Sequence, residues 1–190
     1  SLPKDLDYRR KGPNKPTQNV SWNDCQKFIE KLNTMTGRTF SLPTEAQWEF
    51  AALGGNRSKG YLYAGGDSIN EVAWTDFNLG EQIFHGPMDV ALKKPNELGI
   101  YDMSGNVEEW CYDYRAPYSY VESNVDPVYD GPEYYWNRIM RGGSVDNGPR
   151  KPSTVVLLNL AQYNVKWRHS AKPEYSNFHI GMRLAMKVQQ

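Results

Sequence analysis

Nine residues in the middle of the chain, DMSGNVEEW (102–110), gather three carboxylates around a glycine. Carboxylate and carbonyl oxygens are the ligands that hard cations such as Ca²⁺ take in proteins. A glycine permits the tight turn that brings such oxygens together. The same residue types also suit a helix start, a catalytic centre or a hydrogen-bonded surface turn. The residues alone leave these four interpretations open.

Other side chains that could carry chemistry are scattered. Cys25 and Cys111 form no C-x-x-C pair, and the three histidines form no H-x-x-x-H or H-x-E pair. Glu45 and Glu49 share one helical face at a spacing of four residues, which is typical of a polar helix face. We expect both cysteines to be buried free thiols that pack as small hydrophobic groups. A disulfide between them is the alternative.

The first element that must position these groups is a helix that begins at SWNDCQKF. Ser21 is a good N-cap, and Asp24 lies at capping-box spacing from it. Gly37 is a plausible end. The apolar residues on one face recur at helical spacing: Cys25, Phe28, Ile29 and Leu32.

A second short helix is expected in LPTEAQWEFAALGG. Thr44 caps it and Gln47 completes another capping box. Trp48 and the two alanines that follow form the buried face, and the glycine pair at 54–55 ends the helix.

The rest of the chain indicates an α+β domain. After the second helix, turn residues recur every few positions, and RIM, TVVLLNL and IGMRLAMK are strand candidates. The 190 residues suit a single domain over 1–190. Lys plus Arg equals Asp plus Glu, 22 each, so no global charge favours nucleic acid or an anionic membrane. No long apolar run predicts insertion into a membrane.

Five stretches in order resemble one family: NVSWNDCQKF, RTFSLPTEAQWEFAALGG, PNELGIYDMSGNVEEWCYDY, IMRGGS and HIGMRLAM. This series, from Val20 to Met186, is similar to the formylglycine-generating-enzyme, or sulfatase-modifying-factor, domain. The resemblance implies a variant of the C-type lectin fold with two short helices, short antiparallel strands and much irregular loop. The family's first strands are missing, or are represented only in part by residues 1–19.

The resemblance also offers an answer for DMSGNVEEW. In the family this segment holds calcium, and the corresponding positions here are Asp102, Gly105, Val107 and Glu109. Calcium is therefore the expected cofactor, in a structural role. The alternative is a capped turn in which Glu109 accepts backbone N–H groups and no metal binds.

The family's enzymes oxidise a substrate cysteine with copper held by two thiolates, which suit soft Cu(I). Both cysteines follow RGGS in those enzymes. Here Asn147 and Pro152 stand near these positions. The resemblance therefore predicts no copper and no oxidation of cysteine, and we interpret the chain as a non-catalytic, ligand-binding member, a pseudoenzyme.

Aromatic residues between 112 and 179 predict where such a ligand binds, because tyrosine and tryptophan give contact area at low entropic cost. The ligand would be a protein, a peptide or a glycan. The C-terminal part of this region, residues 144–179, also resembles the variable part of retroelement-diversified proteins of the lectin fold. The alternative is that these aromatics fill the core. The candidate contacts are Tyr134, Trp136, Asn147, Tyr163, Trp167, His169, Tyr175 and Phe178.

Two other functions stay open. One is an enzyme of unrecognised chemistry in the same groove, and the other is a structural component of a cell-envelope assembly. A secreted, periplasmic or cell-surface location is the expectation, and the sequence indicates no oligomeric state.

Overall fold

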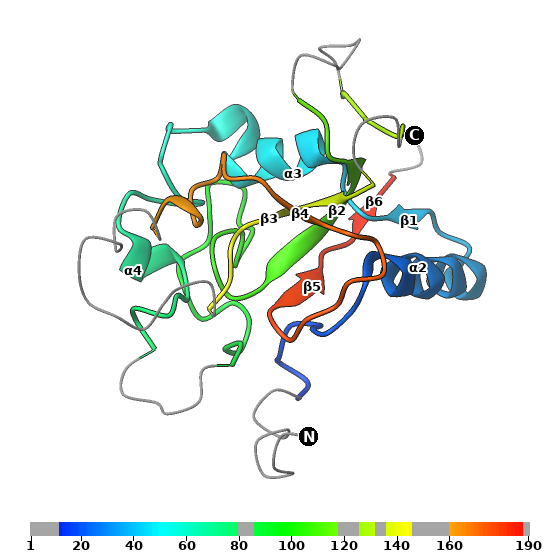
Figure 1. Ribbon diagram of the computed structural model, residues 1–190. Coiled ribbons are helices and arrows are strands. Elements are labelled where there is room, and N and C mark those ends of the chain that lie inside the picture. Colours follow the sequence, from blue (N-terminus) through cyan, green and yellow to red (C-terminus); the bar gives the residue numbers. More distant parts are fainter. Residues whose placement is uncertain (1–11, 80–85, 118–125, 132–135, 146–159, 188–190) are drawn as a thin grey trace.

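A four-stranded sheet lies at the centre of the fold, with its strands in the order β4-β3-β2-β5 (Figure 1). The computed structural model describes residues 12–79, 86–117, 126–131, 136–145 and 160–187. A second sheet pairs β1 with β6. The strands are β1 (Phe40–Ser41), β2 (Glu108–Tyr114), β3 (Arg138–Arg141), β4 (His169–Ala171), β5 (Ile180–Met182) and β6 (Ala185–Met186).

One strand pair departs from the antiparallel arrangement that was expected. β2 runs antiparallel to β3, and β3 to β4, but β2 and β5 are parallel, with Glu109 opposite Gly181. A parallel pair needs a long crossover connection. The chain between β2 and β5, which includes β3 and β4, supplies it. The α+β class is confirmed.

The first expected helix is α2 (Trp22–Thr36). The Ser21 side chain accepts the N–H of Asp24, and the Asp24 carboxylate accepts the N–H of Ser21, so the capping box is present. Gly37 ends the helix in the left-handed conformation, φ 65°. The expected apolar face is narrower than its spacing indicated: Ile29 is buried, but Phe28 is 48% exposed, because only a thin stripe of α2 faces the core.

The second expected helix is α3 (Glu45–Ala52), with the Thr44–Gln47 capping box in place. A short 3₁₀ turn (Gly55–Arg57) and a one-turn helix, α4 (Ile69–Val72), follow. Within the described residues, no helix has the length and apolar character that crossing a membrane requires.

The two helices cover opposite faces of the central sheet. Successive side chains of a strand point to opposite faces, and the neighbours Trp110 and Cys111 lie in different hydrophobic clusters. One cluster joins Cys111 to Trp48 of α3, and the other joins Trp110 to Ile29 of α2. Figure 1 shows α3 and α2 on either side of the strands. β2 is therefore buried on both faces.

One strand prediction was incomplete, and a second is not tested. IGMRLAMK divides into β5 and β6, which belong to different sheets. TVVLLNL, at 154–160, lies outside the described residues except for its last position. The sequence pattern does not indicate the strand β2, because its buried carboxylates interrupt the apolar pattern by which a strand is recognised.

The turn before β2 depends on Gly105. This residue has φ 79°, and a Cβ there would meet the backbone oxygen of Trp74, against which the turn packs. We predict that Gly105→Ala lowers the free energy of unfolding by about 3 kcal/mol or more, from left-handed strain plus overpacking.

Gly60→Ala is the matched control, because Gly60 has φ 74° but no neighbour within 4 Å of the added Cβ. It should cost only the strain, about 1–2 kcal/mol. Urea denaturation measures both variants. Equal losses would show that the contact with Trp74 does not constrain the turn.

Candidate functional site

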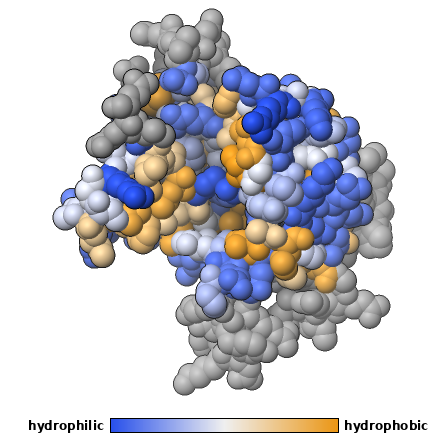
Figure 2. All heavy atoms as spheres, turned by 180° about the vertical axis from the view of Figure 1, so that it is seen from behind, coloured by the Kyte–Doolittle hydropathy of each residue, from blue (hydrophilic) through white to orange (hydrophobic). Residues whose placement is uncertain are grey.

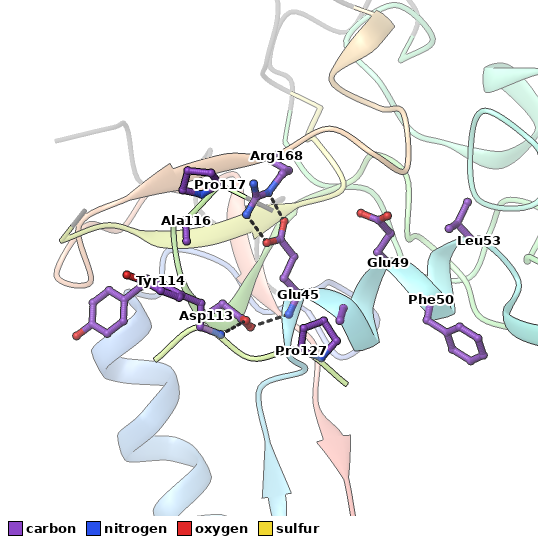
Figure 3. Close-up of a pocket in the computed structure, with 12 residues that line it drawn as sticks. Glu45, Glu49, Phe50, Leu53, Asp113, Tyr114, Ala116, Pro117, Pro127 and Arg168 are labelled. Carbon is purple, nitrogen blue, oxygen red and sulfur yellow. Dashed lines mark hydrogen bonds and ion pairs between the residues drawn. The ribbon is translucent and has the colours of Figure 1, made fainter. Parts of the chain in front are cut away.

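A pocket of about 320 Å³ opens between α3 and the segments that follow β2 (Figure 3). Alanine, leucine, phenylalanine, proline and tyrosine form most of its wall, while three carboxylates and one guanidinium supply its charge. The residues that line it are Glu45, Ala46, Glu49, Phe50, Leu53, Asp113, Tyr114, Ala116, Pro117, Pro127, Tyr129 and Arg168.

Glu45 lies at the floor of this pocket because the cap at Thr44 starts α3 there. Arg168 binds it in two places: Nε donates to Oε1 and Nη2 to Oε2, both at 2.6 Å. Arg141 Nη1 donates to the same Oε1 at 2.7 Å. Figure 3 shows the guanidinium of Arg168 directly beside the carboxylate of Glu45, joined to it by dashed lines. Glu45 is therefore held by two cations.

Arg141, on β3, has no exposed surface. It also pairs with Glu49, one turn after Glu45 on α3, and donates to the Val165 carbonyl at 2.7 Å. A buried guanidinium is tolerated only when its charge and its N–H groups find partners. The spacing of Glu45 and Glu49, which we interpreted as a polar helix face, thus allows both carboxylates to pair with one buried arginine.

Asp113, near the end of β2, connects α3 to the loop at 126–131. Its Oδ2 accepts the N–H of Glu45 at 2.7 Å, and its Oδ1 accepts the N–H of Tyr129 at 2.9 Å. Burial raises the pKa of this carboxyl, and the two backbone N–H groups partly oppose the rise. Asp113 therefore fixes the width of the pocket at this end.

Most charged groups of the pocket already have partners within the protein. The described residues that line the pocket include no cysteine, serine, threonine, lysine or histidine. Its carboxylates are engaged by guanidinium or backbone N–H groups. What remains open to a ligand is mainly apolar surface and the rim at Glu49, whose side chain is 25% exposed.

Apolar surface continues beyond the pocket. A Cβ built on Gly55 would lie within 3.3 Å of both Phe50 and Leu98, so these two exposed side chains are neighbours. Figure 2 shows a face of the molecule on which hydrophobic patches lie beside a hollow. Apolar side chains therefore lie beside the pocket as well as inside it.

DMSGNVEEW borders a second hollow, of about 470 Å³. It begins as an irregular loop, with Asp102 and Asn106 at positive φ, and becomes β2 at Glu108. The helix-start interpretation is therefore wrong. Glu109 turns inward: Trp48 Nε1 donates to its Oε2 at 2.7 Å, and Arg183 reaches both of its oxygens at 2.8 and 2.9 Å.

The calcium ligands fit in part. Asp102 Oδ2 accepts the N–H of Ala91 at 2.8 Å, while its Oδ1 is buried without a hydrogen-bond partner. Burial raises the pKa of Asp102, with Glu109 adding to the rise while Ala91 and Arg183 oppose it. Glu109 already has a bidentate cation in Arg183. No cluster of three or more His, Cys, Asp or Glu with metal-binding geometry occurs in the described parts of the chain.

Glu108 points to the other face of β2 from Glu109 and is buried. Its two oxygens lie 3.1 and 3.2 Å from Nδ1 of His169, on β4. This hydrogen bond is the largest cause of the raised pKa of His169, which burial partly opposes. His169 thus has a structural partner, although half of its side chain remains exposed.

The predicted aromatic contacts do not converge on the pocket. Tyr163 is wrong as a ligand contact: it is fully buried, and its hydroxyl bonds to Asp76 and to the Ser144 carbonyl at 2.9 Å, so it belongs to the core. Tyr134 and Asn147 lie outside the described residues. Among the described pocket-lining residues none is a predicted contact. The remaining predicted residues are at least partly accessible: Trp136, Trp167, His169, Tyr175 and Phe178.

Two residues of the pocket lining, Glu45 and Glu49, stand out in the sequence, but their spacing indicates only a polar helix face. Arg168 lies between two predicted contacts, Trp167 and His169. Phe50, whose half-exposed ring follows Glu49 on the open face of α3, was missed. The available signal was an aromatic residue on the polar face of a helix, which contradicts the amphipathic pattern.

The two cysteines are free and buried, as predicted. They belong to the two different hydrophobic clusters, on opposite faces of the sheet. Burial raises the pKa of Cys25 to about 12 and that of Cys111 well above its usual value. Because the two cysteines lie on opposite faces of the sheet, the alternative of a disulfide between them is wrong.

Known proteins resemble this chain over most of its length. A family model, the sulfatase-modifying factor enzyme 1-like domain, matches residues 3–188. "Chaperone protein LppX" of Paenibacillus barcinonensis is 38% identical over 138 residues, which cover 66% of this chain and 45% of the relative. "Formylglycine-generating enzyme" of Streptomyces coelicolor is 33% identical over 184 residues, 91% of this chain and 53% of that enzyme. The chain thus spans about half the length of these curated relatives.

The fold also matches solved structures. Treponema denticola variable protein 1 superimposes with a TM-score of 0.67 and 24% identity, over 94% of this chain and 77% of that one. At this identity the likeness concerns the fold alone. The expected variant of the C-type lectin fold is confirmed.

Calcium binding stays a prediction, and substitution of Asp102 tests it most directly. Calcium that binds only the native protein would stabilise it by about 2.7 kcal/mol at a hundredfold excess over its Kd. We expect chelator to lower Tm and calcium to restore it. Asp102→Asn should weaken this response, because it removes the charge of the carboxylate, while its amide oxygen still offers an acceptor for Ala91. Glu109→Gln is a poorer test, since it also weakens the pair with Arg183. A wild-type Tm that ignores chelator would contradict the prediction.

The His169–Glu108 pair predicts a pH dependence of stability. Because the folded pKa of His169 is raised, its protonated form contributes stability below the unfolded value of about 6.5, and this contribution is lost as pH rises through the folded pKa. His169→Gln should therefore destabilise the protein more at about pH 5.5 than at about pH 8.5. Denaturation at both pH values measures this, with exposed Lys27→Gln as the control. An equal loss at the two pH values would show that the pair is not ionic.

Proposed function

Since the chain belongs to the sulfatase-modifying factor enzyme 1-like family, we propose that it is a binding member of that family. Its ligand is a polypeptide segment, held in the pocket between α3 and the segments after β2. The observation that carries the proposal is the composition of this pocket: apolar walls around charged groups that already have partners.

The electrostatics of the floor support a binding role. A general base or nucleophile needs an accessible lone pair near its reacting atom. At Glu45 the oxygens accept from Arg141 and Arg168, and at Asp113 they accept backbone N–H groups. These contacts also rigidify the walls, so that the pocket is preformed, which lowers the entropic cost of binding.

The cysteines support the absence of copper oxidation. Copper in this family is held by two thiolates, whereas Cys25 and Cys111 are buried and lie on opposite faces of the sheet. Asn147 and Pro152, near the family's cysteine positions, offer no thiolate.

A polypeptide is the ligand class that the relatives favour. One relative is named a chaperone, and another generates formylglycine, which is a modified amino acid residue. The Phe50–Leu98 surface beside the pocket would bind apolar side chains that flank the segment held inside. Because the chain spans about half of these relatives, the proposal concerns this domain.

Phe50→Ser tests the proposal. Phe50 lines the pocket and is half exposed, so its loss should weaken binding by about tenfold while the fold stays intact. Binding is measured by fluorescence anisotropy on a library of short synthetic peptides that contain apolar residues.

Met35→Ser is the matched control, because Met35 is an exposed apolar residue of α2 and does not line the pocket. It should leave binding unchanged. Equal losses in the two variants, or no affinity of the wild-type protein for any peptide, would contradict the proposed site. Formation of formylglycine on a cysteine peptide with copper and oxygen would contradict the non-catalytic role.

A further inference from the structure

The pocket carries an excess of negative charge. Its lining includes three carboxylates and one guanidinium, and the excess persists when Arg141 behind the floor is counted as a second cation. Arg168 directs two nitrogens to Glu45, at 2.6 Å each, so its charge is already matched. A negatively charged ligand would therefore meet repulsion that no cation of the pocket offsets.

Asp113 adds to this imbalance. Both of its oxygens accept backbone N–H groups, and no guanidinium or ammonium group pairs with it among the described residues. Backbone amides stabilise a carboxylate without cancelling its charge. In a site lined by apolar groups such a charge acts at longer range than it would in water.

Glu49 is where a ligand can meet the charge. Its Oε2 pairs with Arg141 from inside, yet a quarter of the side chain is exposed at the rim. The neighbouring wall is apolar. It comprises Phe50 of α3, Leu53 at the C-cap of that helix, and Pro127 from the opposite loop. Figure 3 shows Glu49 and Phe50 projecting from the same helix along different directions. Because both residues nevertheless line the pocket, a long apolar stem can lie along the wall while its end reaches the carboxylate.

We propose that the pocket selects a cationic side chain of the bound polypeptide, a lysine or an arginine, whose methylene stem packs on the apolar wall and whose charge faces Glu49. Such side chains bury their stems along apolar surface while the charged end stays near a polar partner. This inference rests on the proposed function: it names which residue of the polypeptide enters the pocket.

Three peptides test the selectivity. They share one neutral sequence and carry lysine, norleucine or glutamate at the central position; norleucine preserves the stem and removes the charge. We expect affinity to fall in that order, with lysine at least fivefold above norleucine. The difference should shrink when the salt concentration rises from about 0.05 M to about 0.5 M, because the rim charge is screened.

Variants locate the charge. Glu49→Gln should abolish the preference for lysine over norleucine, whereas Glu30→Gln, an exposed glutamate of α2, should leave it unchanged. Because Glu49 also pairs with buried Arg141, a second variant avoids that contact. Phe50→Lys places a cation at the rim and should weaken the lysine peptide more than the norleucine peptide, while Phe50→Leu should affect both equally.

The outcomes distinguish a failure of the charge selectivity from a failure of peptide binding itself. If norleucine, lysine and glutamate peptides bind equally, the charge selectivity is wrong and peptide binding stands. If n-butylammonium binds as tightly as the lysine peptide, the pocket takes small amines and the inference is overturned. If no peptide binds, the proposed function fails and this inference with it.

Discussion

The buried guanidinium of Arg141 is the constraint on which the rest of the site depends. Because this guanidinium has no exposed surface, its charge must be compensated inside the protein. Helix α3 supplies two carboxylates one turn apart, Glu45 and Glu49. The Trp48 ring, between them in sequence, lies 5.2 Å from the same guanidinium. The start, the orientation and the buried face of α3 are thereby fixed against β3, and the pocket forms on the outer side of this contact.

Strand β2 also carries buried charges that are compensated by partners. It is buried on both faces, yet three of its seven residues are carboxylates. Each carboxylate has hydrogen-bond partners from a different part of the chain. Glu109 accepts hydrogen bonds from Trp48 and Arg183, and Glu108 is hydrogen-bonded to His169. Asp113 accepts backbone N–H groups from the two walls of the pocket. Removing one partner of such a buried pair leaves an uncompensated charge, which is more costly than never having buried the pair. The carboxylates of β2 thus connect several parts of the fold, whether or not Asp102 also binds calcium.

Local signals in the sequence predicted local structure. The capping boxes at Ser21 and Thr44 and the glycine at 37 placed both helices, since each signal involves residues three or four apart. The burial of both cysteines also followed from their neighbours. The family resemblance, carried by five separate segments, supplied the fold that local patterns could not.

The pocket could not be predicted because its contacts join distant residues. Arg168 is 123 positions from Glu45, and Asp113 is 68 positions from the same residue. Nothing in the neighbourhood of Glu45 indicates these partners. Tyr163 illustrates the converse error: its type suits a ligand contact, but long-range packing buries it against Asp76 and Ser144. Residue type predicts what a side chain can do, and tertiary packing decides whether it is accessible.

The most direct test of this account is a double-mutant cycle between Glu45 and Arg141. Glu45→Leu, Arg141→Leu and the double variant are compared with the wild-type protein by urea denaturation. If the carboxylates of α3 serve to compensate the buried arginine, each single variant should lose about 3–5 kcal/mol and the double variant clearly less than the sum, with a coupling of about 2 kcal/mol or more. Losses that simply add would show that the two side chains act independently, and the ion network would not be what holds the pocket.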